Sequence, residues 1–431
     1  MLTITLVLLI VILLLGVPVP LAFFGTAMLL FFSSGDYQLS FLLSSGVSKA
    51  STTLLFAIPL FIMGGGIMEK GNIGSQLISL VELAVKRVKG GLGIVGVVAS
   101  ALFGSVTGSA CATISCIGTI MFPKLANAGI PRGHAAALMA NASILGMLIP
   151  PSGIMILYAW LSGQSVLACF LSTLIPGVIL ATLLSIINVV LLRKNPDVKD
   201  VDVVEAKPGE TLRRWKSAVP ALMMPVIILG GIYSGVMTPT EAAGVAVIYS
   251  IPVGMFVYKG LNFRSLKESI ISSATTTGVI MFMLICVMVL SRIYIMEDVP
   301  SRILNVLRAI SDNKYVILFV LNVFMVIIGM LMDDTSAVLL CTPILVPVVT
   351  QLGISPIHFA AILGVNLGLG NITPPCAPLL YLGGRLAGAP INEMMRPAMT
   401  MIIFGWIPCL LLTTYIPAMG TFLPNLILGI K

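Results

Sequence analysis

Residues 140–153 read ANASILGMLIPPSG, and residues 364–377 read GVNLGLGNITPPCA. Each stretch starts as an apolar helix and loses its helix-forming character at a proline pair, Pro150-Pro151 or Pro374-Pro375. Proline has no N–H to donate and clashes with the preceding turn, so both helices must be interrupted there. Inside a lipid bilayer an unwound backbone is tolerated only where it is buried in protein or lines a wet cavity. The two stretches therefore predict two breaks whose free backbone groups can hold a ligand.

An internal repeat relates the two stretches. Subtraction gives one offset, 224, for matched proline, histidine and glycine pairs: Pro150 and Pro374, His134 and His358, Gly146 and Gly370. Aligned without a gap, residues 123–153 and 347–377 are identical at about ten of about thirty-one positions. Membrane helices can resemble one another by composition alone, but the chain's only two histidines falling at one offset argues for duplication.

The composition is that of a helical membrane protein. Of 431 residues, 58% are hydrophobic and only 9% are charged, whereas a soluble domain has about 25% charged residues. Many apolar runs of about 20 residues fit membrane-spanning helices. The net charge of +8 comes from short loops and one central linker, so it indicates topology and not nucleic-acid affinity. The seven cysteines show no C-x-x-C spacing, which argues against a zinc site or a disulfide framework.

The apolar runs and the repeat divide the chain into six segments. We expect scaffold spans and an interfacial helix in 1–89, a first repeat core in 90–192, a cytoplasmic linker in 193–217, scaffold spans and the start of the second repeat in 218–314, a second repeat core in 315–418 and a C-terminal tail in 419–431. The basic ends of the linker place it in the cytoplasm by the positive-inside rule. Residues 1–15 lack a basic start and a cleavage site, so we interpret them as a retained span.

Each repeat core is expected to contain a re-entrant helical hairpin and a broken helix. The hairpins are placed at 90–122 and 315–350, the broken helices at 133–161 and 356–388, and further spans at 166–192 and about 398–416. The polar tips GSVTGSACATISC (104–116) and DDTS (333–336) coincide at the repeat offset. The alternative for 90–122 is an ordinary span whose Gly/Ser face packs closely on a neighbour. The predicted fold is an all-α polytopic membrane protein with two repeats, which we expect to be inverted because such broken helices usually are.

Hydroxyl, amide and carboxylate oxygens gather at the tips and breaks. A sodium ion prefers hard oxygen ligands, and unwound carbonyls are common ligands of coupling ions. The candidate sodium ligands are Ser105, Thr107, Gly108, Ser109, Asn141, Ser143 and Gly146 in the first half, and Asp333, Asp334, Thr335, Ser336, Asn366, Gly368, Gly370 and Thr373 in the second. The structural alternative is that such hydroxyls bond to carbonyls of their own helix. We expect sodium as the coupling ion, no transition metal and no organic cofactor.

Charged side chains are costly inside a membrane, so we interpret the adjacent Asp333 and Asp334 as candidate functional-site residues. We expect at least one to coordinate a cation, or to pair with Arg292 or a substrate hydroxyl; a solvated loop is the alternative. Arg292 can bind a carboxylate through two hydrogen bonds or extend to the interface from a helix end. The candidate substrate ligands are Arg292, Asp333, Asn371, Pro151 and Ser152. The matched histidines, His134 and His358, favour structural caps over proton transfer.

Five segments resemble the large membrane subunit of tripartite ATP-independent periplasmic (TRAP) transporters. They are PLFIMGGGIMEKGNI (59–73), FGSVTGSACAT (103–113), MFPKLANAGIPRGHAAALMANASILGMLIPPSGIMILYA (121–159), MTPTEAAG (237–244) and MLMDDTSAVLLCTPILVPV (330–348). The resemblance covers nearly the whole chain. It implies a sodium-driven importer of organic carboxylates in a bacterial inner membrane, in which two hairpins and two broken helices move as an elevator against a scaffold. It also implies a small membrane (Q) subunit and a periplasmic binding protein that delivers the substrate.

The chain begins with the large subunit's first span, so we expect the small subunit to be a separate chain. The substrate is expected to be sialic acid or a C4-dicarboxylate, and similarity favours sialic acid. A sodium- or proton-coupled carboxylate carrier that acts without a binding protein is the alternative. An enzyme is disfavoured because H-E-x-x-H, G-x-S-x-G and G-x-G-D runs are absent. A primary pump would need a P-loop, and a passive scaffold has no use for paired breaks with polar tips.

Overall fold

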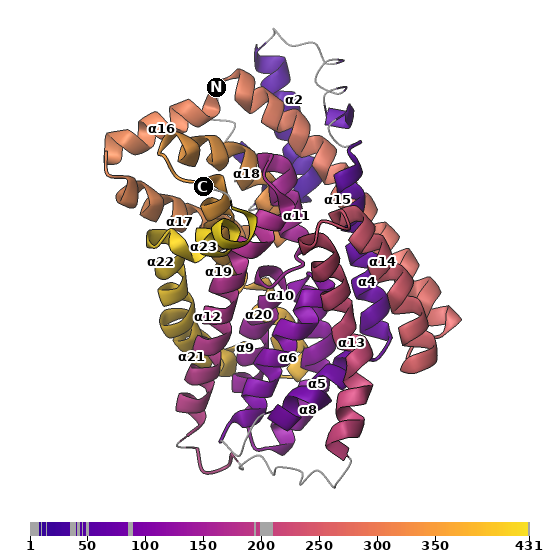
Figure 1. Ribbon diagram of the computed structural model, residues 1–431. Coiled ribbons are helices and arrows are strands. Elements are labelled where there is room, and N and C mark those ends of the chain that lie inside the picture. Colours follow the sequence, from indigo (N-terminus) through magenta and orange to yellow (C-terminus); the bar gives the residue numbers. More distant parts are fainter. Residues whose placement is uncertain are drawn as a thin grey trace.

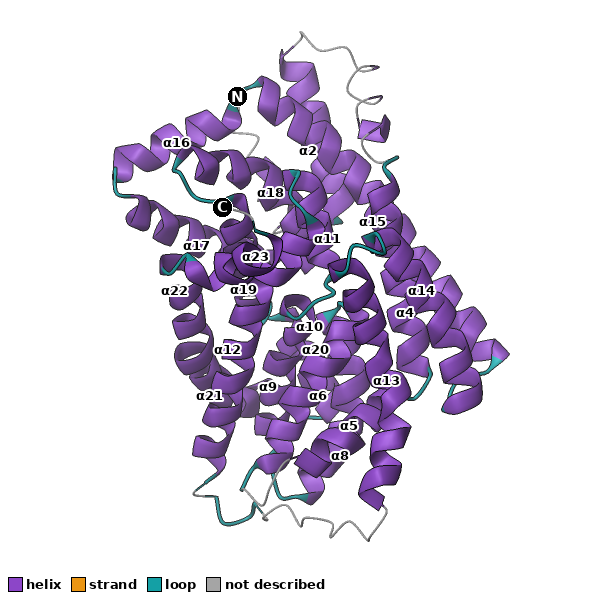
Figure 2. Ribbon diagram, in the orientation of Figure 1, coloured by secondary structure: helices purple, strands orange, loops and turns teal. Residues whose placement is uncertain are grey.

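The structure is a computed structural model that describes residues 8–34 except 10 and 14, residues 40, 44 and 46–48, and residues 51–84, 89–193, 195–198 and 210–429. All regular elements in these ranges are helices (Figures 1 and 2). Eight of the described helices are long and apolar enough to cross a membrane, or nine if one bent pair counts as a span. The predicted all-helical, polytopic fold is confirmed.

One group of helices forms a wall along one side of the molecule (Figure 1). It contains α2 (Val19–Ser34), α4 (Ala57–Lys70), α13 (Glu210–Tyr233), α14 (Pro239–Pro252) and α15 (Phe263–Met296). The 34 residues of α15 extend about 51 Å, so this helix follows the wall over most of its height. It packs against α2 and α4, and α4 packs in turn against α14. These are the helices that the sequence predicts as scaffold spans.

The first repeat core begins with a helix that stops short and reverses. Helix α6 (Gly91–Thr107) ends at Gly108, and the chain returns through α7 (Ala110–Thr113), a π-helical segment (Ile114–Gly118) and α8 (Thr119–Asn127). The predicted broken helix follows as α9 (Arg132–Ser143), α10 (Leu145–Leu148) and α11 (Gly153–Ser162), with a 43° bend between its parts. Helix α12 (Val166–Leu192) has the predicted bounds.

The second repeat core has the same order of elements. Helices α17 (Lys314–Leu331) and α18 (Asp334–Gln351) form the hairpin, and α19 (Pro356–Gly370) and α20 (Pro378–Ala387) form the broken helix. A final span combines α21 (Ile391–Met401), a π-helical segment (Ile402–Trp406) and α22 (Ile407–Tyr415). The hairpins lie at opposite ends of the molecule (Figure 1), which is the placement that inverted repeats require; the inversion stays a prediction.

The two cores pack together crosswise. Helix α11, the second part of the first broken helix, packs against α18 of the second hairpin. Helix α20, the second part of the other broken helix, packs against α9 and the π-helical segment of the first hairpin. Each break is thereby flanked by elements from both halves of the chain.

Two helices differ from the sequence expectations. The expected tail at 419–431 contains helix α23 (Ala418–Leu428), which packs against α12 and α19 and brings Gly420 close to His358. Helix α16 (Val299–Ile310) lies across α18 and was not anticipated, because it is too polar on one face to read as a span. Much of the expected first span and the basic end of the interfacial helix lie outside the described residues. The other domain boundaries stay predictions.

Candidate functional site

The tip of the first hairpin lies against the first break. Gly108 takes the left-handed conformation, with φ of 63°, and Ser109 then begins the returning arm in an extended conformation. A Cβ on Gly108 would lie 3.0 Å from both the Pro151 carbonyl oxygen and the Gly153 nitrogen. One turn earlier in α6, a Cβ on Gly104 would lie 2.3 Å from the Cα of Gly146, so only glycine fits at position 104. The sequence therefore places small residues where the hairpin and the unwound backbone meet.

The second hairpin meets the second break through a side chain. Asp333 is the N-cap of α18 and accepts hydrogen bonds from the backbone N–H groups of Thr335, at 3.1 Å, and Ser336, at 3.3 Å. Asp334 faces the break and accepts a hydrogen bond from the side-chain amide of Asn371. A glycine pair repeats here as well, because a Cβ on Gly370 would lie 2.6 Å from the Cα of Gly329.

The peptide bond between the paired prolines is cis in both breaks. The first break is buried at Pro150, Pro151 and Ser152, whereas Pro374 is half-buried and Pro375 is exposed. The breaks are thus not equivalent in their access to solvent, although their sequences are related.

A cavity of about 420 Å³ lies where the two tips approach each other. Five of the predicted site residues line it: Thr107, Gly108 and Ser109 of the first tip, and Asp334 and Thr335 of the second. Gly153, which follows the first break, lines it too. The structure therefore brings together oxygen-bearing groups that are more than 220 residues apart in the sequence. We call this space the central cavity.

The wall helices close the other side of the central cavity. Helix α4 contributes Gly65, Gly66 and Glu69, and α15 contributes Ser272, Ser273 and Thr276. None of these residues was singled out as a ligand from the sequence. Two signals could have found them: three successive glycines within a helix (64–66) and a run of hydroxyl residues (272–277, SSATTT) within an otherwise apolar one.

Several predicted sodium ligands have partners within their own helix. Ser105 donates to the Leu102 carbonyl at 2.8 Å, Ser143 donates to Ala140 at 2.8 Å, and Thr373 donates to Leu369 at 2.6 Å. This is the structural alternative for helical hydroxyls, although each oxygen retains capacity as an acceptor. Ser336 donates its hydroxyl to Asp333 and so completes the cap of α18.

The two asparagines of the broken helices are fully buried. Asn141 donates to the Ala137 carbonyl at 2.7 Å and accepts from the indole of Trp406 at 2.9 Å. Asn366 donates to Ile362 at 2.8 Å and to Asn322 at 2.9 Å. Gly368 makes room for Trp406, because a Cβ there would lie 2.9 Å from the indole ring. These residues pack the broken helices and do not line the central cavity.

Two buried oxygens near the breaks have no hydrogen-bond partner in the described part of the chain. They are Oγ of Ser152, in the first break, and Oδ1 of Asn366, on the helix that leads to the second. A buried polar atom without a partner is costly, so such an atom is a candidate ligand for an ion.

Arg292 and the histidines lie away from the central cavity. Arg292 is on α15, twelve residues beyond the lining residue Ile280, which is about 18 Å along the helix axis. His134 bonds through Nε2 to Asn188 at 2.9 Å, and His358 bonds to the Thr413 carbonyl at 2.7 Å. Both histidines therefore tie the start of a broken helix to a neighbouring span.

The chain matches known proteins over most of its length. A family described as "Tripartite ATP-independent periplasmic transporter, DctM component" matches residues 6–419. The chain is 34% identical to the C4-dicarboxylate TRAP transporter large permease protein DctM of Pseudomonas aeruginosa, covering 86% of each. It is 30% identical to the sialic acid TRAP transporter large permease protein SiaM of Vibrio cholerae, covering 96% of each.

The fold is also similar to that of a solved transporter. The YdaH transporter of Alcanivorax borkumensis superposes with a TM-score of 0.62 over 89% of this chain and 90% of that one, at 16% sequence identity. The relatives are named as transporter permeases, and the described helices include at least eight that can span a membrane. The chain belongs to the DctM family of tripartite ATP-independent periplasmic transporters, and it is an inner-membrane transport protein, not an enzyme.

Proposed function

We propose that the protein imports an organic carboxylate together with sodium, that a periplasmic binding protein delivers this substrate, and that the two cores move against the wall helices as an elevator. The central cavity is the observation that carries the proposal. It is lined by both hairpin tips, by Gly153 after the first break and by α4 and α15. The groups proposed to move and the wall proposed to stay fixed therefore meet around one space.

Oxygen chemistry supports sodium as the coupling ion. Asp334, the tip hydroxyls of Thr107 and Ser109, and the buried Ser152 Oγ are hard ligands close to unwound backbone. Carbonyls at helix breaks are common ligands of coupling ions in transporters. Asp334 also links the second tip directly to Asn371, so an ion bound at this carboxylate would order tip and break together.

The size and lining of the central cavity support a small polar substrate. Its volume of about 420 Å³ lies within the range of about 300–1,000 Å³ that small-molecule sites occupy. Ser272 and Ser273 offer hydroxyl donors to a carboxylate or to the hydroxyls of a sugar acid. The Thr276 hydroxyl donates to the Ser272 carbonyl at 3.0 Å and retains its capacity as an acceptor. Relatives named for C4-dicarboxylate, sialic acid and 2,3-diketo-L-gulonate are 34%, 30% and 31% identical, so similarity supports the class of acid and not one member.

Relatives support the proposed partners. The isethionate TRAP transporter permease protein DctMQ of Oleidesulfovibrio alaskensis is matched over 95% of this chain but only 64% of its own length. We propose that a separate small membrane subunit supplies the part of DctMQ that this chain does not match. We also propose that the binding protein docks on the assembly from the periplasm.

Reconstitution tests the proposal. The chain and its small subunit are placed in liposomes with labelled sialic acid or succinate, a binding protein and an inward sodium gradient. We expect uptake that requires both the binding protein and sodium. Uptake that ignores the binding protein would favour the carrier that acts alone, and uptake driven by a proton gradient without sodium would remove the sodium assignment.

A further inference from the structure

In the described part of the chain the central cavity adjoins a second hollow, which in turn adjoins a third. The second hollow, of about 530 Å³, shares the lining residues Glu69 and Ser115 with the central cavity. The third, of about 550 Å³, shares Thr119 with the second. Together the hollows follow the returning arm of the first hairpin, from α7 along the π-helical segment to α8.

This route leads to the end of the molecule that carries the linker. Lys124 of α8 and Arg214 of α13 both contact Glu82, at 2.6 and 4.0 Å. The Asp197 carbonyl, at the start of the linker, lies 1.9 Å from the position that a Cβ on Gly129 would take. The basic ends of the linker place this end in the cytoplasm, so the two outer hollows open from the central cavity toward the cytoplasm.

Four of the five charged residues that line the outer hollows are positive. Lys70 and Lys259 line the second, and Arg132 and Arg385 line the third. Glu69, at the junction with the central cavity, is the acidic residue among the described lining residues of the two. A cleft with one sign of charge and low-dielectric walls raises the local concentration of the opposite ion.

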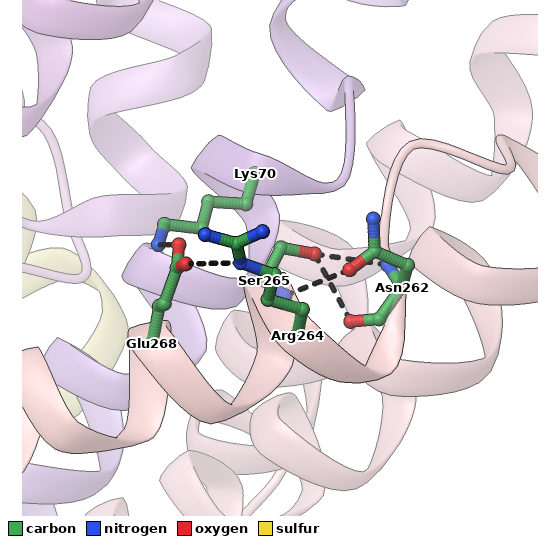
Figure 3. Close-up of polar contacts among 5 residues, drawn as sticks. All are labelled: Lys70, Asn262, Arg264, Ser265 and Glu268. Atoms are coloured by element: carbon green, nitrogen blue, oxygen red, sulfur yellow. Dashed lines mark hydrogen bonds and ion pairs between the residues drawn. The ribbon is translucent and has the colours of Figure 1, made fainter.

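Few of these charges are neutralised by a neighbour. Lys70 pairs with Glu268 at 3.1 Å, and Arg264 competes for the same carboxylate at 3.3 Å (Figure 3). Because Glu268 is 53% exposed, this pair is screened by water. Lys259, Arg132 and Arg385 make no ion pair with a carboxylate in the described part of the chain.

Lys259 lies in a turn whose backbone is held in place by hydrogen bonds on both sides. Asn262 and Ser265 form a capping box that fixes the start of α15 (Figure 3). Lys259 lies just before it at φ of 53°, and the hydroxyl of Tyr258 donates to the Ser217 carbonyl at 2.7 Å. The turn is therefore held in place beside the second hollow.

The arginine pair belongs to one end of the protein only. Adding the repeat offset of 224 to Arg132 gives Pro356, and subtracting it from Arg385 gives Leu161. The fold is repeated, but these charges are not. A function at the cytoplasmic end alone explains this asymmetry better than a role in folding, which both halves would share.

We propose that the two outer hollows form an anion-selective release path, in which Lys70 and Lys259, followed by Arg132 and Arg385, draw the carboxylate from the central cavity to the cytoplasm. This inference rests on the proposed function for its substrate. Exposed, hydrated cations attract an anion without holding it, which suits a path that must release its ion.

Cysteine modification tests the path without substrate or sodium. Cys111 lines the central cavity and is exposed, so it serves as the single thiol after the other six cysteines are replaced by alanine. Anionic and cationic methanethiosulfonates, sulfonatoethyl and trimethylammonioethyl, are applied to the reconstituted full chain from the cytoplasmic side. We expect the anionic-to-cationic rate ratio to exceed that of a free thiol about fivefold.

Neutralising the path should remove this preference. The variants Lys70→Gln with Lys259→Gln, and Arg132→Gln with Arg385→Gln, are each expected to lower the rate ratio about threefold. The matched control is Arg308→Gln with Lys314→Gln, which removes two exposed charges that line neither hollow and should leave the ratio unchanged. A thermal unfolding transition in detergent equal to that of the single-cysteine parent shows that each variant is folded.

An unchanged ratio in both path variants, or modification of Cys111 only from the periplasmic side, would overturn the release path. These outcomes are separate from a failure of the proposed function, which appears as absent uptake in liposomes while the rate ratio still responds to neutralisation.

Discussion

Asp333 and Asp334 are adjacent in the chain but have different partners. Asp333 is exposed and caps α18 by accepting backbone N–H groups, whereas Asp334 faces the central cavity and accepts from Asn371. An N-cap needs only a short side-chain oxygen, which asparagine also provides. A cation ligand at the tip needs the negative charge.

We therefore predict that Asp334→Asn raises the sodium concentration for half-maximal uptake about tenfold, which corresponds to about 1.4 kcal/mol. Asp333→Asn is the matched control and should leave this concentration unchanged. Both are measured in proteoliposomes over a sodium titration. Equal sodium dependence in the wild type and Asp334→Asn would remove Asp334 from the ion site.

The histidines give a second prediction at the residue scale. His134 bonds to Asn188, whose amide donates to the Gly90 carbonyl at 2.8 Å, so three segments meet at one buried ring. His134→Ala leaves the Asn188 oxygen unpaired and should lower the free energy of unfolding by about 1–3 kcal/mol. The measurement is thermal unfolding in detergent. Unaltered unfolding combined with lost uptake would instead assign His134 to proton transfer.

At the scale of elements, three glycines let α4 approach three different helices. A Cβ on Gly64 would lie 3.7 Å from Val247 of α14, which is ordinary contact. A Cβ on Gly65 would lie 3.1 Å from the Cα of Thr107 at the first tip, and one on Gly66 would lie 2.9 Å from the Ser269 hydroxyl of α15. Gly65 thus sets how closely the wall and the first hairpin meet, because the atom opposite it is a backbone atom of Thr107 and not a flexible side chain.

Gly65→Ala should lower uptake on the order of tenfold, because it displaces the first tip from the wall of the central cavity. Gly64→Ala changes the same helix by one methyl group at a site with room, and should retain uptake. Both are compared as initial rates at equal protein density. Equal rates for the two variants would mean that the close approach at Thr107 is not needed for transport.

At the scale of the whole molecule, the elevator proposal requires the tip to leave the wall. The Cβ position of Gly65 lies 3.3 Å from that of Thr107, near the about 3.8 Å usual for a disulfide. In a cysteine-free chain, oxidation of Gly65→Cys with Thr107→Cys should abolish the lowered uptake that the reduced pair retains, and reduction should return uptake to that lowered level. Gly64→Cys with Val247→Cys, a pair in contact between α4 and α14 of the wall, serves as the control once oxidation is shown to cross-link it. Full uptake by the oxidised Gly65–Thr107 pair would rule out movement between these groups.

The sequence by itself determined the elements that depend on local chemistry. The proline pairs forced two breaks because proline cannot donate to a helix, and small polar residues at the offset of 224 predicted two hairpin tips. The bounds of α12 and the order of elements in both cores follow from apolar runs and turns along the chain. The repeat also placed both aspartates at a tip expected to face a break, but only the structure shows that Asp334 is the one that does.

Only the tertiary structure decided which groups surround the central cavity. Glu69, Ser272, Ser273 and Thr276 line it because α4 and α15 pack beside the tips, and such packing depends on contacts between distant parts of the chain. The same packing leaves Arg292 about 18 Å along α15 from the lining residue Ile280. It also lines up Lys70, Lys259, Arg132 and Arg385 along one route, although they come from four separate parts of the sequence. The periodicity and spacing of residues indicate which local structure a segment can form. Which helices then pack against it depends on the burial of whole helix faces.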